Sequence, residues 1–175
     1  MTTDEQGEGG WPDALYDILK EAGVTAANYV PDAGHARLIR RFHDDPEMTA
    51  NVLTTEEEGV AIAAGAWAGG ARSVLLMQSS GVGNCINMLS LPVLSRTPFL
   101  TLVTMRGEYA EFNPWQMPMS RAVAPALEAI GVTVLRADDA ETLLAATRQA
   151  ARMVFDADQQ IAILIGQGLI GAKQW

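Results

Sequence analysis

The sequence predicts an α/β fold, with one doubly wound domain, a parallel sheet of about six strands and helices on both faces. Three observations favour this fold. Short apolar runs alternate along the chain with segments of helical spacing. The run at 73–77 is apolar at successive positions, which is typical of a strand buried on both faces. The chain has 175 residues, of which 49% are hydrophobic, and this suits a single domain with one core.

The expected elements follow one another in the order that a parallel sheet requires. The strands are expected at 27–30, 51–53, 73–77, 99–104, 132–135 and 161–165. The helices are expected at 11–22, around 38–42, at 56–68, at 84–94, over a segment that ends at 129, and at 140–155. In the first helix Leu15, Ile18 and Leu19 have helical spacing, and Gly23 ends it. Helices between strands imply right-handed crossovers, which build a parallel sheet.

Composition limits the compartment and the partners. Residues 1–10 are acidic and glycine-rich and lack the basic and apolar regions of a signal peptide, so they are predicted to be a disordered tail before a domain at 11–175. No apolar run approaches the ~18 residues of a membrane span. Cys85 is the single cysteine, and the net charge of −9 argues against nucleic acid. We expect a cytoplasmic protein that does not bind membranes or nucleic acid.

The carboxyl ends of the strands are the expected site, because ligands of doubly wound folds bind there. The loops at that edge are 31–35, 54–58, 78–84 and 104–118. The second of them opens a helix with Thr55 and then Glu56, Glu57 and Glu58. Thr55 and Glu58 have the spacing of a capping box, and the three carboxylates suit the helix dipole. These residues alone fit a solvated acidic first turn as well as a functional one.

A family resemblance gives this turn a chemical meaning. The runs EEGVA at 57–61 and AGAW at 64–67 resemble the segment that carries the cofactor glutamate in thiamine-diphosphate enzymes. Trp67 stands where that family has an aromatic residue, ten positions after the glutamate, which selects Glu57. Together with MQSSGVGN at 77–84, the chain most closely resembles the alpha subunits of sulfopyruvate decarboxylases. Phosphonopyruvate decarboxylases are the next nearest resemblance.

The resemblance implies a lyase subunit with a thiamine-diphosphate pyrimidine-domain fold, which decarboxylates 3-sulfopyruvate to sulfoacetaldehyde in sulfonate metabolism or coenzyme M biosynthesis. Glu57 would then hydrogen-bond the aminopyrimidine ring. The family holds the diphosphate and Mg²⁺ through a Gly-Asp-Gly motif in a second domain type, and no such motif occurs here. We therefore expect a separate beta subunit that brings the diphosphate site and Mg²⁺, in a homo- and hetero-oligomer. We expect no metal on this chain, since two histidines and one cysteine are too few for zinc.

Other residues receive expected roles by the same resemblance. Gln78, Ser79 and Asn84 are expected to bind cofactor, although a tight turn with a helix cap explains that segment equally well. Asp32 and His35 are expected at the reacting centre. A single histidine in a turn is more often structural, so that alternative stays open. A nucleotide site is disfavoured because the third glycine of the dinucleotide fingerprint is missing.

The long loop 106–118 mixes aromatic, proline and charged residues, and long loops in compact domains tend to be functional. Arg106 and Gln116 are expected to bind substrate, and Arg121 is a second candidate for the substrate oxyanion. Ion pairs from arginine to Glu108 or Glu111 are the structural alternative. Two other functions also remain open: a phosphonopyruvate decarboxylase subunit, and a non-catalytic pyrimidine-domain protein that only binds partners.

Overall fold

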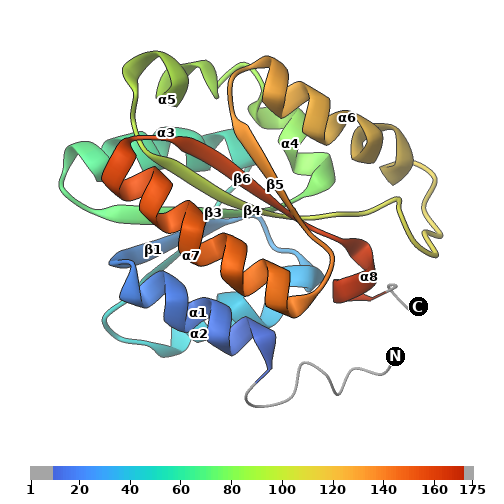
Figure 1. Ribbon diagram of the computed structural model, residues 1–175, viewed down its shortest axis with the longest axis horizontal. Coiled ribbons are helices and arrows are strands. Elements are labelled where there is room, and N and C mark those ends of the chain that lie inside the picture. Colours follow the sequence, from blue (N-terminus) through green and yellow to red (C-terminus); the bar gives the residue numbers. More distant parts are fainter. Residues whose placement is uncertain (1–9, 172–175) are drawn as a thin grey trace.

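The computed structural model describes residues 10–171, and six strands in that range form one parallel sheet (Figure 1). The strands are β1 (Val24–Tyr29), β2 (Thr49–Val52), β3 (Arg72–Gln78), β4 (Phe99–Thr104), β5 (Thr133–Ala137) and β6 (Gln160–Ile165). Their order across the sheet is β2-β1-β3-β4-β6-β5, and every neighbouring pair is parallel. The predicted doubly wound α/β fold is confirmed. The expected tail at 1–10 lies outside the described residues, apart from Gly10.

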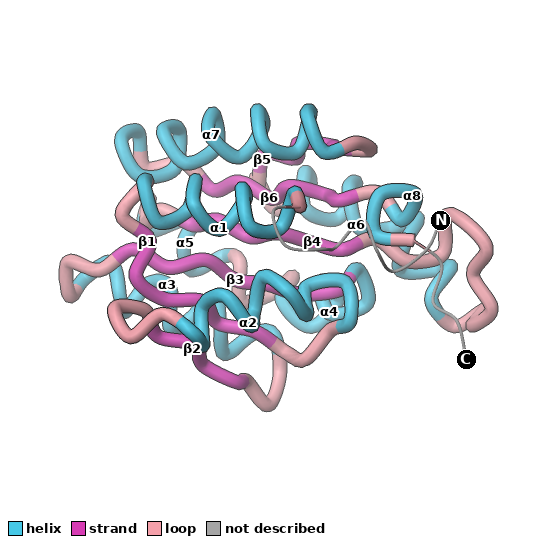
Figure 2. Tube along the Cα trace, turned by 90° about the horizontal axis from the view of Figure 1, so that it is seen from below, coloured by secondary structure: helices cyan, strands magenta, loops and turns pink. Residues whose placement is uncertain are grey.

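Helices cover both faces of this sheet. They are α1 (Trp11–Glu21), α2 (Ala36–Asp44), α3 (Glu56–Ala68), α4 (Ser79–Cys85), α5 (Ser90–Ser95), α6 (Gln116–Ala129), α7 (Ala140–Ala157) and α8 (Gln167–Ile170), with a 3-10 turn η2 at Ala33–His35. Figure 2 shows α1 and α2 on the near side of the strands and α3, α5 and α6 behind them. None of the helices in the described range 10–171 is long and apolar enough to cross a membrane.

The core has two parts because side chains of a strand alternate between the faces of the sheet. In β3, Leu76 packs with Leu19 of α1 and the residues of α2 and α7, whereas Leu75 and Met77 pack with α3, α4 and α6. Leu75, Leu76 and Met77 are all fully buried. This explains the apolar run that the sequence shows at 73–77: a strand covered on both faces has no side that needs polar residues.

Two segments differ from the sequence prediction. The expected helix at 84–94 is two short helices, α4 and α5, and α4 already begins at Ser79, where a turn was expected. Pro92 lies in the first turn of α5, where a missing N–H costs nothing, so it starts a new helix instead of extending the old one. The short helix α8 was not expected at all. The first strand begins at Val24, three residues early, because Gly23 with φ +77° turns α1 directly into it.

Candidate functional site

The strand order predicts a ligand crevice at the carboxyl ends of β1 and β3. From β1 the chain passes to β2 on one side, and the next strand, β3, pairs with β1 on the other side. At such a switch point the loops after the two strands diverge, which leaves room for a ligand between them. The segments that follow β1 and β3, at 30–35 and 78–84, therefore form the centre of the candidate site.

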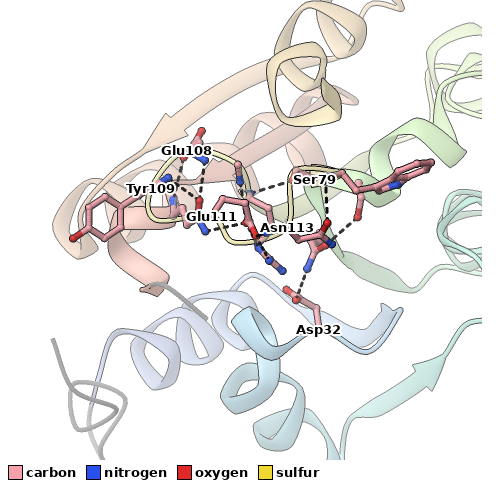
Figure 3. A network of polar contacts seen from close by, with 12 residues as sticks. Asp32, Ser79, Glu108, Tyr109, Glu111 and Asn113 are labelled. Carbon is pink, nitrogen blue, oxygen red and sulfur yellow. Dashed lines mark hydrogen bonds and ion pairs between the residues drawn. The ribbon is translucent and has the colours of Figure 1, made fainter. Parts of the chain in front are cut away.

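Asp32 connects the ends of three strands in this crevice. Its Oδ1 accepts a hydrogen bond from Gln78 Nε2 at 3.0 Å, and its Oδ2 accepts one from Thr104 Oγ1 at 2.5 Å. Gln78 in turn accepts from Ser80 Oγ at 3.0 Å. Asp32 is half-buried, so its carboxylate is oriented by the protein and still reaches the surface. Figure 3 shows Asp32 below the loop that follows β4.

His35 lies beneath Asp32, inside the protein. Its side chain is 1% exposed, and Nε2 lies 3.1 Å from the carbonyl oxygen of Leu102. Nδ1 is buried without a hydrogen-bond partner among the described residues. Burial lowers the pKa of His35, against the opposing influence of Asp32 and two backbone carbonyls. A neutral, enclosed imidazole fits the structural alternative, and the expected proton-transfer role of His35 stays a prediction.

The first turn of α3 holds one buried carboxylate, and it belongs to Glu56. Glu56 is 8% exposed, and its Oε2 accepts a hydrogen bond from Asn84 Nδ2 at 2.8 Å. The carboxylate lies against Gly81 of α4 so closely that a Cβ at Gly81 would overlap it. Glu57 and Glu58 are exposed. The sequence assigns Glu56 to the helix dipole and Glu57 to the site. Within the described chain Glu56 is the buried one, and the site role of Glu57 stays a prediction.

Helical spacing explains why Glu56 is buried and Glu57 is exposed. The buried residues of α3 are Glu56, Gly59, Val60 and Ala63, which are spaced i, i+3, i+4 and i+7 and so share one face. That face packs on β3, where a Cβ at Gly59 would overlap the Leu75 side chain. Glu57 is about 100° away from Glu56 around the helix and points outward. The spacing of Gly59, Val60 and Ala63 places Glu56 on the same face of the helix, and packing on β3 and α4 buries that face.

The expected capping box is not formed. Thr55 is the N-cap residue of α3, but its side chain makes no capping hydrogen bond. Glu58 instead reaches back to the backbone N–H of Thr54, with its Oε2 accepting at 2.8 Å. Glu58 therefore caps the helix one residue further upstream than the capping-box pattern predicts, and it remains at the surface.

Cys85 closes the buried side of the α3–α4 contact. Burial, and to a lesser extent the carboxylates of Glu56 and Glu57, raise the pKa of its thiol to about 12. The thiol therefore stays protonated at neutral pH and is a weak nucleophile. Its role is to pack against Met77, with the two sulfur atoms 3.9 Å apart.

The loop after β4 is organised around the carboxylate of Glu111, whose side chain is 1% exposed. Arg106 donates to it from Nε at 2.7 Å and from Nη2 at 2.6 Å. The backbone N–H groups of Gly107 and Asn113 donate at 3.2 and 3.0 Å, and Gln167 Nε2 donates at 3.2 Å. Arg106 itself is 7% exposed. The sequence left an ion pair open as the alternative to substrate binding by Arg106, and the geometry shows that ion pair.

A hydrogen bond connects the beginning of the loop to the start of α4. The backbone N–H of Arg106 donates to Ser79 Oγ at 3.1 Å, and Ser79 is fully buried (Figure 3). Gln78, Ser79 and Asp32 thus meet at the predicted place, but Ser79 is occupied by the backbone. Gln116 begins α6, and its Oε1 is buried without a hydrogen-bond partner among the described residues. An unpaired acceptor of this kind is costly and is a candidate for a ligand contact.

Metal-ligand clusters are absent from the part of the chain that the structure describes. No group of three or more His, Cys, Asp or Glu side chains among residues 10–171 could hold a metal ion.

Two solved structures similar to this chain belong to much longer proteins. The 2-oxoglutarate:ferredoxin oxidoreductase of Magnetococcus marinus matches with a TM-score of 0.74 and 16% identity, over 91% of this chain and 29% of that one. A thiamin diphosphate-dependent enzyme from Mycobacterium smegmatis matches with a TM-score of 0.68 and 21% identity, over 89% and 30%. At these identities the likeness establishes the fold, and this chain spans about a third of each matched chain.

Sequence relatives are closer. No family model matches the chain. The sulfopyruvate decarboxylase subunit alpha of Methanothermobacter thermautotrophicus is 36% identical over 121 residues, which are 69% of this chain and 73% of the relative. That of Methanococcus maripaludis is 29% identical over 87% of this chain and 92% of the relative. The phosphonopyruvate decarboxylase of Streptomyces viridochromogenes is 40% identical over 53% of this chain and 24% of the relative. By this identity over most of its length, the chain belongs to the family of sulfopyruvate decarboxylase alpha subunits.

Proposed function

We propose that this chain is the alpha subunit of a thiamine-diphosphate-dependent decarboxylase that converts 3-sulfopyruvate to sulfoacetaldehyde and CO₂. The observation that carries the proposal is the 36% identity to a sulfopyruvate decarboxylase alpha subunit over most of both chains. The crevice supports it, because the Glu56 carboxylate is held in place by Asn84 and is therefore suited to sharing a proton with a bound heterocycle.

The residues at the start of α3 fit the pyrimidine half of thiamine diphosphate. A glutamate at this place would hydrogen-bond a ring nitrogen and share a proton with it. We assign that role to Glu56, because Asn84 and Gly81 fix its carboxylate at the edge of the crevice. Glu57, which the spacing to Trp67 favoured, is the rival assignment. When bound, thiamine diphosphate supplies the electron sink for decarboxylation.

The other half of the site is assigned to a partner subunit. No Gly-Asp-Gly motif occurs in the 175 residues, so we propose that a beta subunit brings the diphosphate site together with Mg²⁺. The relatives from Methanococcus maripaludis and Methanothermobacter thermautotrophicus are named as alpha subunits, which supports a two-subunit enzyme.

Recognition of the substrate sulfonate falls to residues of α6 in this proposal. The Arg106 guanidinium is already paired with Glu111, so we no longer assign it to substrate. Gln116 begins this helix and has a side-chain NH₂ group that can donate to an oxyanion, and Arg121 is exposed five residues further along the same helix. An arginine can bind an oxyanion with two hydrogen bonds, which suits a sulfonate.

The test is to combine the chain with a beta subunit that carries a Gly-Asp-Gly motif and to assay a panel of 2-oxo acids with thiamine diphosphate and Mg²⁺. Turnover of 3-sulfopyruvate far above pyruvate is expected, because donors built for an oxyanion lose their partners when a methyl group replaces it. Equal rates with pyruvate would remove sulfopyruvate as the substrate. Preference for phosphonopyruvate would favour the second candidate, which the Streptomyces relative supports. A stable complex without any turnover would favour a non-catalytic binding role.

A further inference from the structure

The loop from 106 to 115 is fixed by a residue far away in the sequence. Gln167 lies at the start of α8, just after β6, and is 1% exposed. Its Oε1 accepts hydrogen bonds from the backbone N–H groups of Glu108 and Tyr109, both at 2.8 Å. Its Nε2 donates to Glu111 Oε2 at 3.2 Å. One amide side chain therefore forms hydrogen bonds with three residues of the loop, Glu108, Tyr109 and Glu111.

The backbone of Gln167 adds a fourth contact. Its N–H donates to Glu108 Oε2 at 3.1 Å, and Glu108 is paired with Arg136 at the end of β5. Figure 3 shows Glu108, Tyr109 and Glu111 gathered around these dashed contacts. The loop follows β4, so these bonds join the carboxyl ends of three neighbouring strands, β4, β6 and β5.

The 106–115 loop has a strained backbone conformation that needs support from the surrounding structure. Ala110, at the tip, has φ +46°, and Gly107 has φ +75°. A non-glycine residue with positive φ is strained and persists only when its surroundings determine it. Tyr109 and Trp115 are 61% and 84% exposed, so no apolar burial of these large side chains holds the loop in place. The buried polar contacts to Gln167 and Glu111 hold it in place, together with Phe112, whose ring lies 5.6 Å from the Arg106 guanidinium.

The loop also sets the position of two parts of the candidate site. At its beginning, the N–H of Arg106 is bonded to Ser79 at the start of α4. At its end, the backbone N–H of Gln116 donates to the carbonyl oxygen of Asn113 at 3.0 Å, which starts α6. A change in the loop would therefore move Gln116 relative to the crevice, although Gln167 itself does not face it.

We propose that Gln167 is a positioning residue for the reaction: it locks the 106–115 loop and thereby sets the place of Gln116 in the substrate site. The inference rests on the proposed function, since it requires a substrate that Gln116 contacts. Gln167 acts through the loop and touches neither substrate nor cofactor.

The test compares Gln167→Leu with Gln160→Leu. Leucine at 167 keeps the size of the side chain and deletes three hydrogen bonds. Gln160 is the matched control, because it begins β6, the strand that precedes Gln167, and its Nε2 donates to the carbonyls of Thr97 and Asp158, away from the loop. Hydrogen–deuterium exchange of the full chain measures how often the hydrogen bonds of the loop open. Steady-state kinetics of the complex with its beta subunit measure whether a displaced Gln116 weakens substrate binding.

Gln167→Leu should speed exchange of the Glu108 and Tyr109 amides about tenfold or more, since each lost hydrogen bond shifts the local opening equilibrium. It should raise the KM for 3-sulfopyruvate about tenfold and change kcat less, as expected when ground-state and transition-state binding are lost together. Gln160→Leu should leave both unchanged. Unaltered loop exchange, or faster exchange with an unaltered KM, would overturn the proposal.

Gln167→Glu separates positioning from general stability. A carboxyl group there can still accept from the two amides, but when ionised it faces Glu111 and Glu108 as well as Arg106 and Arg136. Ionisation of that carboxyl group removes the donor to Glu111 and adds a negative charge beside Glu108 and Glu111, so the lock should open as pH rises. The KM of this variant should therefore increase with pH relative to the wild-type KM, in parallel with loop exchange. A ratio of the two KM values that does not change with pH would contradict the proposal.

A wild-type complex without activity would overturn the proposed function and this proposal together, whereas an active wild type with a normal Gln167→Leu variant would overturn this one alone.

Discussion

Glu56 and Glu57 are adjacent, but they have opposite surroundings, and this difference carries most of the functional argument at the scale of single residues. Glu56 is on the buried face of α3 with its carboxylate bonded to Asn84, while Glu57 faces outward. A catalytic carboxylate must be held in one orientation to share a proton with a ring nitrogen, and hydrogen bonding from neighbours provides that orientation. The pair therefore offers a direct comparison of two acids in one helical turn.

The substitution Glu56→Gln should lower turnover of the reconstituted complex by orders of magnitude, because glutamine keeps the shape but cannot hold the proton. Glu57→Gln should leave turnover close to that of the wild type. Steady-state rates with 3-sulfopyruvate measure both, and gel filtration checks that each variant still assembles. Loss of activity in Glu57→Gln alone would return the role to Glu57, as the spacing to Trp67 suggested.

Glu111 shows how a buried acid is kept charged. Its hydrogen bonds from Arg106, and to a smaller degree from the backbone of Asn113 and Gly107, lower its pKa from 4.5 to about 2, against the opposing effect of burial. A carboxyl group whose pKa is lower in the folded state stabilises the fold at pH values above its unfolded pKa, and this contribution is lost as pH falls through the folded pKa.

We expect Glu111→Gln to destabilise the protein by about 3 kcal/mol at neutral pH, because Arg106 is left buried without its counter-charge. The difference in stability between wild type and variant should shrink as pH falls from 4.5 towards about 2. Urea unfolding at a series of pH values measures it. A difference that stays constant over this range would show that the ionised form of Glu111 is not what stabilises the loop.

At the scale of elements, the contact between α3 and α4 is set by glycine. Gly81 lets α4 lie directly against the Glu56 carboxylate, and Gly59 lets α3 lie against Leu75 of β3. Both glycines cost helix stability relative to alanine, by about 1 kcal/mol each. The close approach that they permit is what brings the acidic turn of α3 up to the end of β3.

Gly81→Ala is therefore expected to push the Glu56 side chain away and to lower turnover of the complex. Gly65→Ala is the control within α3, because a Cβ there meets nothing within 4 Å. That control should raise the stability of the chain by about 0.5–1 kcal/mol, through the better helix propensity of alanine. Activity assays and thermal unfolding of the single chain distinguish the two. A fully active Gly81→Ala complex would show that the placement of Glu56 by α4 is unimportant.

At the scale of the whole molecule, the candidate site is an open edge. Asp32, Glu56 and the 106–115 loop all lie along the carboxyl ends of the strands, around the switch point between β1 and β3. This edge provides oriented carboxylates and a preformed loop. In the proposed enzyme a second subunit completes it.

The purified chain alone should not decarboxylate any 2-oxo acid, with or without thiamine diphosphate and Mg²⁺. Addition of the beta subunit should restore turnover, with a rate that saturates as the beta subunit is added. Carbon dioxide release measures both. Turnover by the isolated chain, free of contaminating partner, would contradict the division of the site between two subunits.

The sequence by itself determined the fold class and the edge of the sheet that carries the site. Both depend on local patterns: apolar runs such as 73–77 mark buried strands, and alternation with helices makes the sheet parallel. A parallel sheet then brings the loops after its strands to one edge. Asp32, Gln78 and Ser79 could be placed together on these grounds alone, before any contact was known.

Only the tertiary structure decided which side chains at that edge are buried and which partners they have. The acidic turn offered three glutamates, and burial of Glu56 depends on Gly81, 25 positions further along the chain. Arg106 was equally suited to substrate or to Glu111 until the loop was seen to fold around that carboxylate. No pattern in the sequence indicated a role for Gln167, because its partners in the loop lie 58 and 59 positions away. Spacing along a chain shows which residues share a face, but the packing of distant elements determines what that face meets.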